Sequence, residues 1–577
     1  MKLHVLALDY DGTIATDGAL DPHVRTAIEA ARRRGFVVVL ATGRILDDLR
    51  CLLGDLSLFD AIVAENGAVV VFPAAGRSTQ LCAPVSPEFV AALRARRVAM
   101  RTGVCVVELA ATERAVALQI LHDLELPLTL HFNRDRLMVL PQAVNKATGL
   151  REALRTMRLS THNAIAIGDA ENDHELLAAC EIGAAVAWGS PALRRTADRV
   201  VPGDGPAAVA RYLDTLTTSQ QVPAEVPARR HLVLGRDRAG EVLSLAVRGR
   251  NVLIAGDPRS GKSWVGGLLC EQLIVQQYCT CIIDPEGDYT ELESLPGVIV
   301  LGSDRPPSVH EVARTLRHSD LSLVLDLTQL DTAEKHDYVL RMLRLLRDVR
   351  GQTGLPHRIV VDEAHHFLHD PSEARVIDHA AGGHTLITYR VCDLEPELLR
   401  SAECVVVTRE TDAAQARLLH DVFKGSGEPA QWQAELAELA FDEAALLPVS
   451  EEAGGRLRRF RVAPRLTRHV RHRHKYLDVP AGRERAFHFR FDGVAGPSVA
   501  SLGELTRVLV CTPAERLREH VIRGDLSRWI GDVLCDGTLA TTVREIEEQH
   551  RLGRAPDFNT AVIHAIKERY GVPEALI

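Results

Sequence analysis

Short apolar runs that end in polar or glycine residues recur along the first third of the chain. Three of them lead into side chains that can take part in catalysis or metal binding: residues 3–8 into Asp9-Tyr10-Asp11, residues 37–41 into Thr42, and residues 164–167 into Gly168-Asp169. Runs of this length predict buried strands. Open α/β sheets place their chemistry at the carboxyl ends of their strands. We therefore predict an α/β domain over residues 1–215, with a functional site that collects these polar ends.

A different pattern begins after residue 250. The apolar run 252–255 leads into a glycine-rich loop, which is followed by apolar positions at helical spacing, Val265, Leu268, Leu269 and Leu273. A strand, a glycine loop and a helix in this order predict a loop whose backbone N–H groups bind phosphate. Lys262 would contact the β- and γ-phosphates of ATP, and the Ser263 hydroxyl would bind Mg²⁺. The residues expected to bind the nucleotide are Gly256, Arg259, Ser260, Gly261, Lys262, Ser263 and Asp362.

Three later apolar runs also end in acidic residues: 279–283 in Asp284, 321–325 in Asp326, and 358–361 in Asp362-Glu363. Asp362 would hold the Mg²⁺ shell, and Glu363 would orient and deprotonate the attacking water. This glutamate favours an ATP-hydrolysing enzyme over a kinase, which must exclude water. Thr388 either senses the γ-phosphate or bonds only to backbone, and both interpretations stay open.

The segments between and after these motifs differ in composition. Residues 216–230 are polar and punctuated by proline, so we predict a linker that precedes a second α/β domain over residues 231–480. The second domain is expected to start with a β-hairpin at residues 232–234 and 242–247. Residues 485–577 are expected to form a small helical domain after one short strand.

Within the helical domain, two local patterns predict helices. Thr512-Pro513-Ala514-Glu515 has the sequence of a helix-capping box. A stripe of apolar residues at helical spacing indicates core packing rather than a ligand site, and its members are Leu526, Trp529, Ile530, Val533 and Leu534.

Composition narrows the class of protein. A chain of 577 residues is too long for a single core, and its 46% apolar and 25% charged residues are typical of soluble globular proteins. No apolar run approaches the ~20 residues of a membrane span, and the amino-terminal run indicates a first strand rather than a signal peptide. Eleven cysteines without paired spacing favour a reducing cytoplasm over disulfides or a zinc site. The net charge of −9 argues against general nucleic-acid affinity.

The first domain resembles the haloacid dehalogenase (HAD) superfamily and in particular its Cof-type phosphatases. The resemblance is carried by the residues at its strand ends and by Lys146 at the start of a helical segment. Glu65-Asn66-Gly67 and Ala197-Asp198 extend this resemblance over the whole domain. The resemblance implies a Rossmann-like core with a small α+β cap at about residues 75–140, and small sugar phosphates as the default substrates. The alternatives are a turn that is merely capped by two aspartates and an inactive pseudo-phosphatase.

The resemblance also implies a role for each motif residue. Asp9 would be the nucleophile that forms an aspartyl-phosphate, and Asp11 would protonate the leaving group and then activate water. Thr42 and Lys146 would hold the phosphoryl oxygens. Mg²⁺ would be bound by Asp9, the Asp11 carbonyl and Asp169, with support from Asn172 and Asp173. A carboxylate can attack a phosphate dianion only if a metal and a lysine offset the negative charge.

Residues 231 to about 425 resemble the HerA/FtsK class of ring-forming motor ATPases. The resemblance is carried by the glycine loop, the string Asp284-Pro285-Glu286-Gly287-Asp288-Tyr289, Asp326 and Asp362-Glu363. It implies a homo-oligomer, usually a hexameric ring, in which Arg390 or Arg409 completes the neighbouring site; a surface salt bridge is the alternative for either arginine. The chain departs from HerA proper because only a short hairpin replaces the amino-terminal β-barrel.

Residues 456–475 form a basic stretch in an otherwise acidic chain, with nine Lys or Arg residues and three histidines. Such a stretch could contact nucleic-acid phosphates or line a subunit interface beside ATP. The alternative is a solvated edge strand with alternating charges. His469, His472 and His474 are weak candidates for metal ligands because no cysteine or carboxylate lies among them.

The sequence therefore predicts a cytoplasmic, bifunctional, phosphate-handling protein. A Mg²⁺-dependent HAD phosphomonoesterase is joined to an ATP-hydrolysing, HerA-like domain, with no membrane association. In one alternative, the motor engages nucleic acid and the phosphatase trims phosphorylated ends. In another, ATP regulates a scaffold that carries a metabolite phosphatase.

Overall fold

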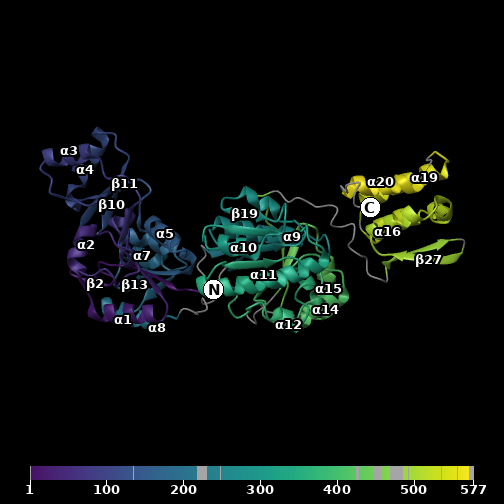
Figure 1. Cartoon of the computed structure of the whole chain (residues 1–577), viewed down its shortest axis with the longest axis horizontal. Coiled ribbons are helices and arrows are strands. Elements are labelled where there is room, and N and C mark those ends of the chain that lie inside the picture. Colours follow the sequence, from purple (N-terminus) through teal and green to yellow (C-terminus); the bar gives the residue numbers. More distant parts are fainter. Residues whose placement is uncertain are drawn as a thin grey trace. The chain divides into compact units, whose positions relative to one another are not determined.

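The computed structural model divides the chain into two compact units: Met1–Pro285 with Leu292–Thr467, and Glu286–Glu291 with Arg468–Ile577 (Figure 1). The residues that the structure describes are 2–133, 135–217, 230–246, 249–423, 428–447, 456–467, 485–491, 493–534, 536–554 and 557–570. Within these ranges, no helix has the length and apolar character needed to cross a bilayer.

The first unit begins with an eight-stranded sheet in the order β14-β13-β12-β1-β4-β5-β6-β7. The strands from β14 to β5 are parallel. In β1 (Val5–Asp9), Leu6 and Leu8 belong to one apolar cluster and Val5 and Ala7 to another, so both faces of the sheet are covered. The other elements are β4 (Val37–Ala41), β5 (Ala61–Ala64), β6 (Val69–Phe72), β7 (Arg77–Gln80), β12 (Ala164–Gly168), β13 (Ile182–Val186), β14 (Arg199–Val201), α1 (Pro22–Arg33), α2 (Leu46–Leu53), α5 (Lys146–Thr156), α6 (His174–Ala179), α7 (Pro191–Thr196) and α8 (Pro206–Thr215).

A smaller antiparallel sheet, in the order β10-β11-β9-β8, is inserted between β7 and α5. Together with two helices it encloses its own core, which includes Phe89, Leu93 and Leu137. We call this inserted part the cap. Its elements are α3 (Pro87–Ala95), β8 (Met100–Thr102), β9 (Val107–Ala110), α4 (Arg114–Asp123), β10 (Leu128–Asn133) and β11 (Arg136–Pro141).

An eleven-stranded sheet follows, in the order β16-β15-β25-β24-β23-β17-β22-β21-β18-β20-β19. Its strands from β23 to β19 are parallel, and the remaining four are antiparallel. Its elements are β15 (His231–Asp237), β16 (Val242–Ala246), β17 (Val252–Ala255), β18 (Thr280–Asp284), β19 (Val298–Leu301), β20 (Ser322–Asp326), β21 (Arg358–Val361), β22 (His384–Thr388), β23 (Cys404–Val407), β24 (Glu443–Leu447), β25 (Arg458–Val462), α9 (Lys262–Val275), α10 (Val309–Thr315), α11 (Thr332–Thr353), α12 (Pro371–Ala374), α13 (Pro396–Arg400), α14 (Ala413–Val422) and α15 (Pro429–Ala437).

The structure corrects the interpretation of the basic stretch as an edge strand. β25 lies inside the sheet, between β15 and β24. Arg459 forms an ion pair with Glu443, and Arg461 Nε lies 2.5 Å from Asp442 Oδ2. Charged side chains on an inner strand are therefore matched by acids near the neighbouring strand. The three histidines of the stretch lie outside the described residues.

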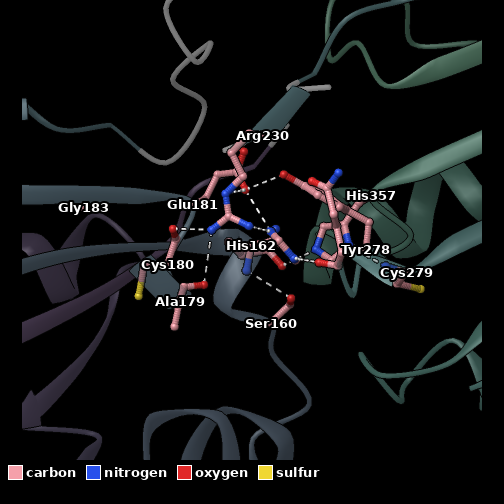
Figure 2. Close-up of polar contacts among 12 residues, drawn as sticks. Ser160, His162, Ala179, Cys180, Glu181, Gly183, Arg230, Tyr278, Cys279 and His357 are labelled. Carbon is pink, nitrogen blue, oxygen red and sulfur yellow. Dashed lines mark hydrogen bonds and ion pairs between the residues drawn. The ribbon is translucent and has the colours of Figure 1, made fainter. Parts of the chain in front are cut away.

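Buried polar contacts join the two large sheets within the first unit (Figure 2). His162 stacks on Tyr278 at 3.7 Å between ring centroids, and its Nδ1 lies 2.9 Å from Glu181 Oε2. The Tyr278 hydroxyl donates to the same oxygen at 2.9 Å, and Arg230 donates to the Cys180 carbonyl at 2.6 Å. Most of these residues lie just before strands, so the contact is formed at the amino ends of strands in both sheets. The carboxyl ends of the parallel strands are not part of it.

Residues 485–570 contain a β-hairpin and a helical bundle. Phe487, Phe489, Leu505 and Trp529 share one apolar core. The elements are β26 (Phe487–Phe491), β27 (Val494–Val499), α16 (Leu502–Cys511), α17 (Arg518–Arg523), α18 (Asp525–Asp532), α19 (Gly537–Arg551) and α20 (Phe558–Tyr570).

The apolar stripe on and just after α18 packs into this core, as the sequence predicts. The predicted capping box is wrong. Thr512 is the C-cap of α16, and Pro513 precedes a 3₁₀ turn, Ala514–Leu517, without a side-chain cap. Because this turn starts one residue later than predicted, Glu515 is not in the position from which a capping-box acid reaches back.

Candidate active site

Three predicted residues lie together at the carboxyl edge of the first sheet. Asp9 is the last residue of β1, Thr42 follows β4 and Asp169 follows β12. β1 pairs with both β4 and β12, so these side chains come from three adjacent strands. All three side chains are buried. Parallel pairing thus explains why residues far apart in sequence meet here.

Lys146 reaches this edge from the first turn of α5. Its Nζ donates to Asp9 Oδ1 at 2.5 Å and to Asp173 Oδ1 at 2.7 Å. A capping box between Asn145 and Thr148 fixes the start of the helix. Gly67 allows this placement, because a Cβ there would lie 1.9 Å from the Asn145 carbonyl oxygen and its φ is +105°.

Backbone and side-chain donors hold the acidic loop after β12. Asp173 Oδ2 accepts from the backbone N–H groups of Asp169 at 3.0 Å and Ala170 at 3.1 Å. Thr13 Oγ1 donates to Asp169 Oδ1 at 3.2 Å. At Gly168, a Cβ would lie 2.6 Å from the Asp173 carboxyl carbon, so only glycine lets this carboxylate approach so closely.

The charges of this edge fit a divalent cation. Asp9, Asp169 and Asp173 each offer a carboxylate oxygen, and these oxygens lie within 4.8 Å of one another. Burial, Asp173 and Asp169 raise the pKa of Asp9 well above its usual range, although Lys146 opposes them. Burial lowers the pKa of Lys146, but Asp173 and Asp9 outweigh burial and raise it. A compact set of carboxylate oxygens suits Mg²⁺.

Arg44 was given no role by the sequence, yet it holds Asp11. Its Nε donates to Asp11 Oδ2 at 2.7 Å and its terminal nitrogen donates to Oδ1 at 2.5 Å. The backbone N–H of Arg44 donates to Thr42 Oγ1 at 3.1 Å. One arginine thus joins the Asp11 carboxylate to the loop of Thr42, in the bidentate geometry that fixes a carboxylate plane. The only sequence signal was its place in Thr42-Gly43-Arg44.

The cap contributes a residue to the same edge. Asn172 Nδ2 donates to Asn66 Oδ1 at 3.4 Å, and Asn66 Nδ2 lies 3.3 Å from His131 Nδ1 on β10. Glu65, which is fully buried, accepts from the backbone N–H groups of Val104 at 2.9 Å and Cys105 at 2.8 Å. His131 had no sequence signal, because its position depends on how the cap folds. Asp198, in contrast, accepts from the Gly183 N–H at 2.8 Å and supports the sheet edge.

The second set of predicted residues lies at the carboxyl edge of the other sheet. The loop 256–261 connects β17 to α9, and Lys262 is the first residue of α9. Its Nζ donates to the Asp257 carbonyl at 2.8 Å and lies 5.7 Å from the centre of the Tyr389 ring. Gly256 has a φ of +140°, and a Cβ there would lie 2.2 Å from Thr408 Oγ1. The backbone of this loop therefore requires glycine.

Asp362 and Glu363 follow β21, which is separated from β17 by β22. Both side chains are buried, and Asp362 Oδ1 accepts from the Glu363 N–H at 3.0 Å. Thr388 at the end of β22 lies 3.0 Å from His365 Nδ1 and accepts from the Arg390 N–H at 2.9 Å.

The two candidate arginine fingers of this edge are surface residues. Arg390 Nε lies 2.8 Å from Asp393, and Arg409 Nε lies 3.9 Å from Asp257. Both arginines are about half exposed. The ion pairs that the sequence offered as the alternative are therefore present, and a role beside a neighbouring subunit stays a prediction.

Comparison with known proteins concerns the first part of the chain. Residues 6–100 and 113–213 match the family described as haloacid dehalogenase-like hydrolase. A phosphoglycolate phosphatase of Natronomonas pharaonis is 32% identical over 211 residues, which are 34% of this chain and 89% of that protein. The chain belongs to the haloacid dehalogenase-like hydrolases. A phosphoglycolate phosphatase of Methanosarcina acetivorans is 26% identical over 226 residues, 37% of this chain and 98% of that protein.

A haloacid dehalogenase-like hydrolase from Bacteroides thetaiotaomicron is a solved structure with 16% identity and a TM-score of 0.34, covering 37% of this chain and 99% of that one. The family match and the two phosphatase relatives show that the amino-terminal part is a phosphatase domain of the haloacid dehalogenase-like type, with a Rossmann-like α/β core. The family match ends at residue 213, before the second large sheet.

Proposed function

We propose that the first domain is a Mg²⁺-dependent phosphomonoesterase that works through an aspartyl-phosphate on Asp9. The observation that carries this proposal is the bridge of Lys146 between Asp9 and Asp173, beside Asp169. A buried lysine between carboxylates supplies the positive charge that lets an anionic nucleophile approach an anionic phosphate.

Each remaining residue has a place in this reaction. Asp9 attacks phosphorus, and Lys146 and the Thr42 hydroxyl hold the phosphoryl oxygens. Asp11 protonates the leaving oxygen and then takes a proton from the water that hydrolyses the aspartyl-phosphate, while Arg44 orients the Asp11 carboxylate. Asp9, Asp169 and Asp173 would hold Mg²⁺, which offsets charge on the phosphoryl oxygens.

The relatives suggest a first substrate to test. Both are phosphoglycolate phosphatases, so we propose a small phosphorylated carboxylic acid, with 2-phosphoglycolate as the lead and small sugar phosphates as the alternative. His131 and Asn66 lie where the cap meets the catalytic edge, and their side chains offer hydrogen bonds to the non-phosphate end of a substrate.

The test is hydrolysis of a phosphate-ester panel by the full chain with Mg²⁺. Asp9→Asn should lower kcat by roughly 10³-fold or more, because the nucleophile is lost. Asp214→Asn, on the exposed face of α8, is the matched control and should leave kcat unchanged. Activity that survives Asp9→Asn would contradict the assignment, and so would an Asp11→Asn variant with normal turnover.

A second candidate function is ATP hydrolysis at the other sheet, in a HerA-like arrangement. The supporting observation is the position of the glycine loop between the central strand β17 and α9, with Asp362 and Glu363 two strands away on the same edge. Backbone N–H groups, Lys262 and Ser263 would hold the phosphates and Mg²⁺, and Glu363 would activate water.

ATP turnover with and without DNA or RNA at low salt tests this candidate and separates its two versions. Lys262→Ala should abolish turnover, whereas Lys335→Ala on α11 should not. Stimulation by nucleic acid would favour the processing version, and an unchanged rate would favour the scaffold version. Loss of ester hydrolysis in Lys262→Ala would contradict two independent sites.

A further inference from the structure

Two histidines and one glutamate meet on the second domain, and none of them is assigned to either phosphate site. His336 lies on α11, Glu373 on α12, and His369 in the segment just before α12. His336 Nε2 is 3.0 Å from Glu373 Oε1, and His369 Nδ1 is 3.5 Å from Glu373 Oε2. The candidate ligand atoms of all three side chains lie within 4.8 Å of one another.

Ion pairing alone leaves this cluster incomplete. Glu373 Oε2 is buried and has no hydrogen-bond partner among the described residues, even though an imidazole nitrogen faces it. Leaving such an oxygen unsatisfied is costly. A cation between the carboxylate and the two imidazoles would satisfy it.

We propose that His336, His369 and Glu373 form a Zn²⁺ site. Zinc bonds of ~2.0–2.2 Å to nitrogen and oxygen in a tetrahedron separate the ligand atoms by roughly 3.3 Å. The two imidazole–carboxylate distances of 3.0 and 3.5 Å are near this value, and small side-chain rotations within the 4.8 Å cluster would complete the set. Two imidazoles favour zinc over the Mg²⁺ that suits the carboxylates around Asp9. The His369 side chain is about half exposed, so water can take the fourth position.

The site would hold in place the segment that follows the proposed ATP site. The segment that carries His369 and Glu373 begins directly after the 3₁₀ turn Ala364–His366, which follows Asp362 and Glu363. Zinc would tie this segment to the long helix α11. The proposal needs neither ATP binding nor phosphatase activity.

The test measures zinc uptake by the full chain in excess Mg²⁺. His469, His472 and His474 are replaced by alanine throughout, so that they do not contribute. This protein should take up one equivalent of Zn²⁺, with Co²⁺ giving the strong visible absorption of a four-coordinate site. Glu373→Gln, which keeps the shape of the side chain, and His336→Ala should each weaken binding roughly 100-fold.

His318→Ala, at an exposed histidine of the same unit, should bind like the parent protein. Circular dichroism of each variant without zinc checks that it is folded. If His336→Ala does not fold, the result for Glu373→Gln decides the test. An absence of stoichiometric zinc uptake, or equal affinity of Glu373→Gln and parent, would overturn the proposal.

Discussion

The proposed phosphatase site and the proposed ATP site each have a lysine at the start of a helix, and the two lysines differ in their contacts. Lys146 Nζ bridges two buried carboxylates, whereas Lys262 Nζ donates to a neutral carbonyl of its own loop. In the first case the lysine is part of the charge balance of the fold. In the second case the contacts of the lysine include a neutral carbonyl of its own loop and the face of the Tyr389 ring. We therefore expect the two lysines to contribute to stability to different degrees.

The largest effect should follow from Lys146→Met. Removing the cation leaves Asp9 and Asp173 buried together, and breaking such a pair costs about 3–5 kcal/mol. Urea unfolding should show this loss without Mg²⁺ and a partial recovery with Mg²⁺, and ester hydrolysis should disappear. Lys335→Met is the control. Unchanged stability of Lys146→Met would show that the carboxylates do not depend on this lysine.

A pH-dependent effect of about 4 kcal/mol between pH 5 and pH 9 is expected at the other edge, from Glu410. Burial and the neighbouring Asp257 raise the pKa of Glu410 to about 8. Because the folded pKa lies above the unfolded value, the folded protein binds the extra proton. Its stabilising contribution is complete below pH ~4.5 and is lost as the pH rises through about 8.

Glu410→Gln should remove this dependence. As the pH rises from 5 to 9, the parent should lose stability that the variant keeps. The difference in the free energy of unfolding, measured with urea, should therefore grow with pH in favour of the variant. Glu435→Gln on the surface of α15 should show the parent's profile. A constant difference between Glu410→Gln and parent across this range would mean that Glu410 is ionised in the folded protein.

The sequence predicts which residues meet at the edge of the first sheet, for a physical reason. Buried parallel strands appear as apolar runs, and their carboxyl ends must meet, so Asp9, Thr42 and Asp169 could be placed together. Arg44 and His131 could not, because their contacts depend on a side-chain direction and on the cap. The sequence also did not predict the inner position of β25, because antiparallel pairing between residues about two hundred positions apart leaves no local pattern. Nor does anything local indicate that His162 meets Tyr278.

A smaller effect is expected from Lys262→Met than from Lys146→Met. The hydrogen bond from Lys262 Nζ to the Asp257 carbonyl is worth about 1–2 kcal/mol, less than the cost of leaving two buried carboxylates without their cation, so we expect a smaller loss of stability without nucleotide. With ATP and Mg²⁺, the parent should gain stability and the variant should not, because ligand that binds only the folded state stabilises it. A variant that loses as much stability as Lys146→Met would remove the contrast between the two lysines.

The smallest effect should come from His131→Ala in the cap. His131 Nδ1 lies 3.3 Å from Asn66 Nδ2, so its loss should remove one hydrogen bond to the substrate or to Asn66, worth about 0.5–1 kcal/mol. KM for 2-phosphoglycolate should rise about three- to fivefold with kcat nearly unchanged, because binding is weakened equally in ground and transition states. His122→Ala, at an exposed histidine of the same cap, is the matched control. If kcat falls while KM stays constant, His131 acts on the chemical step, and the cap belongs to the catalytic machinery rather than to substrate selection.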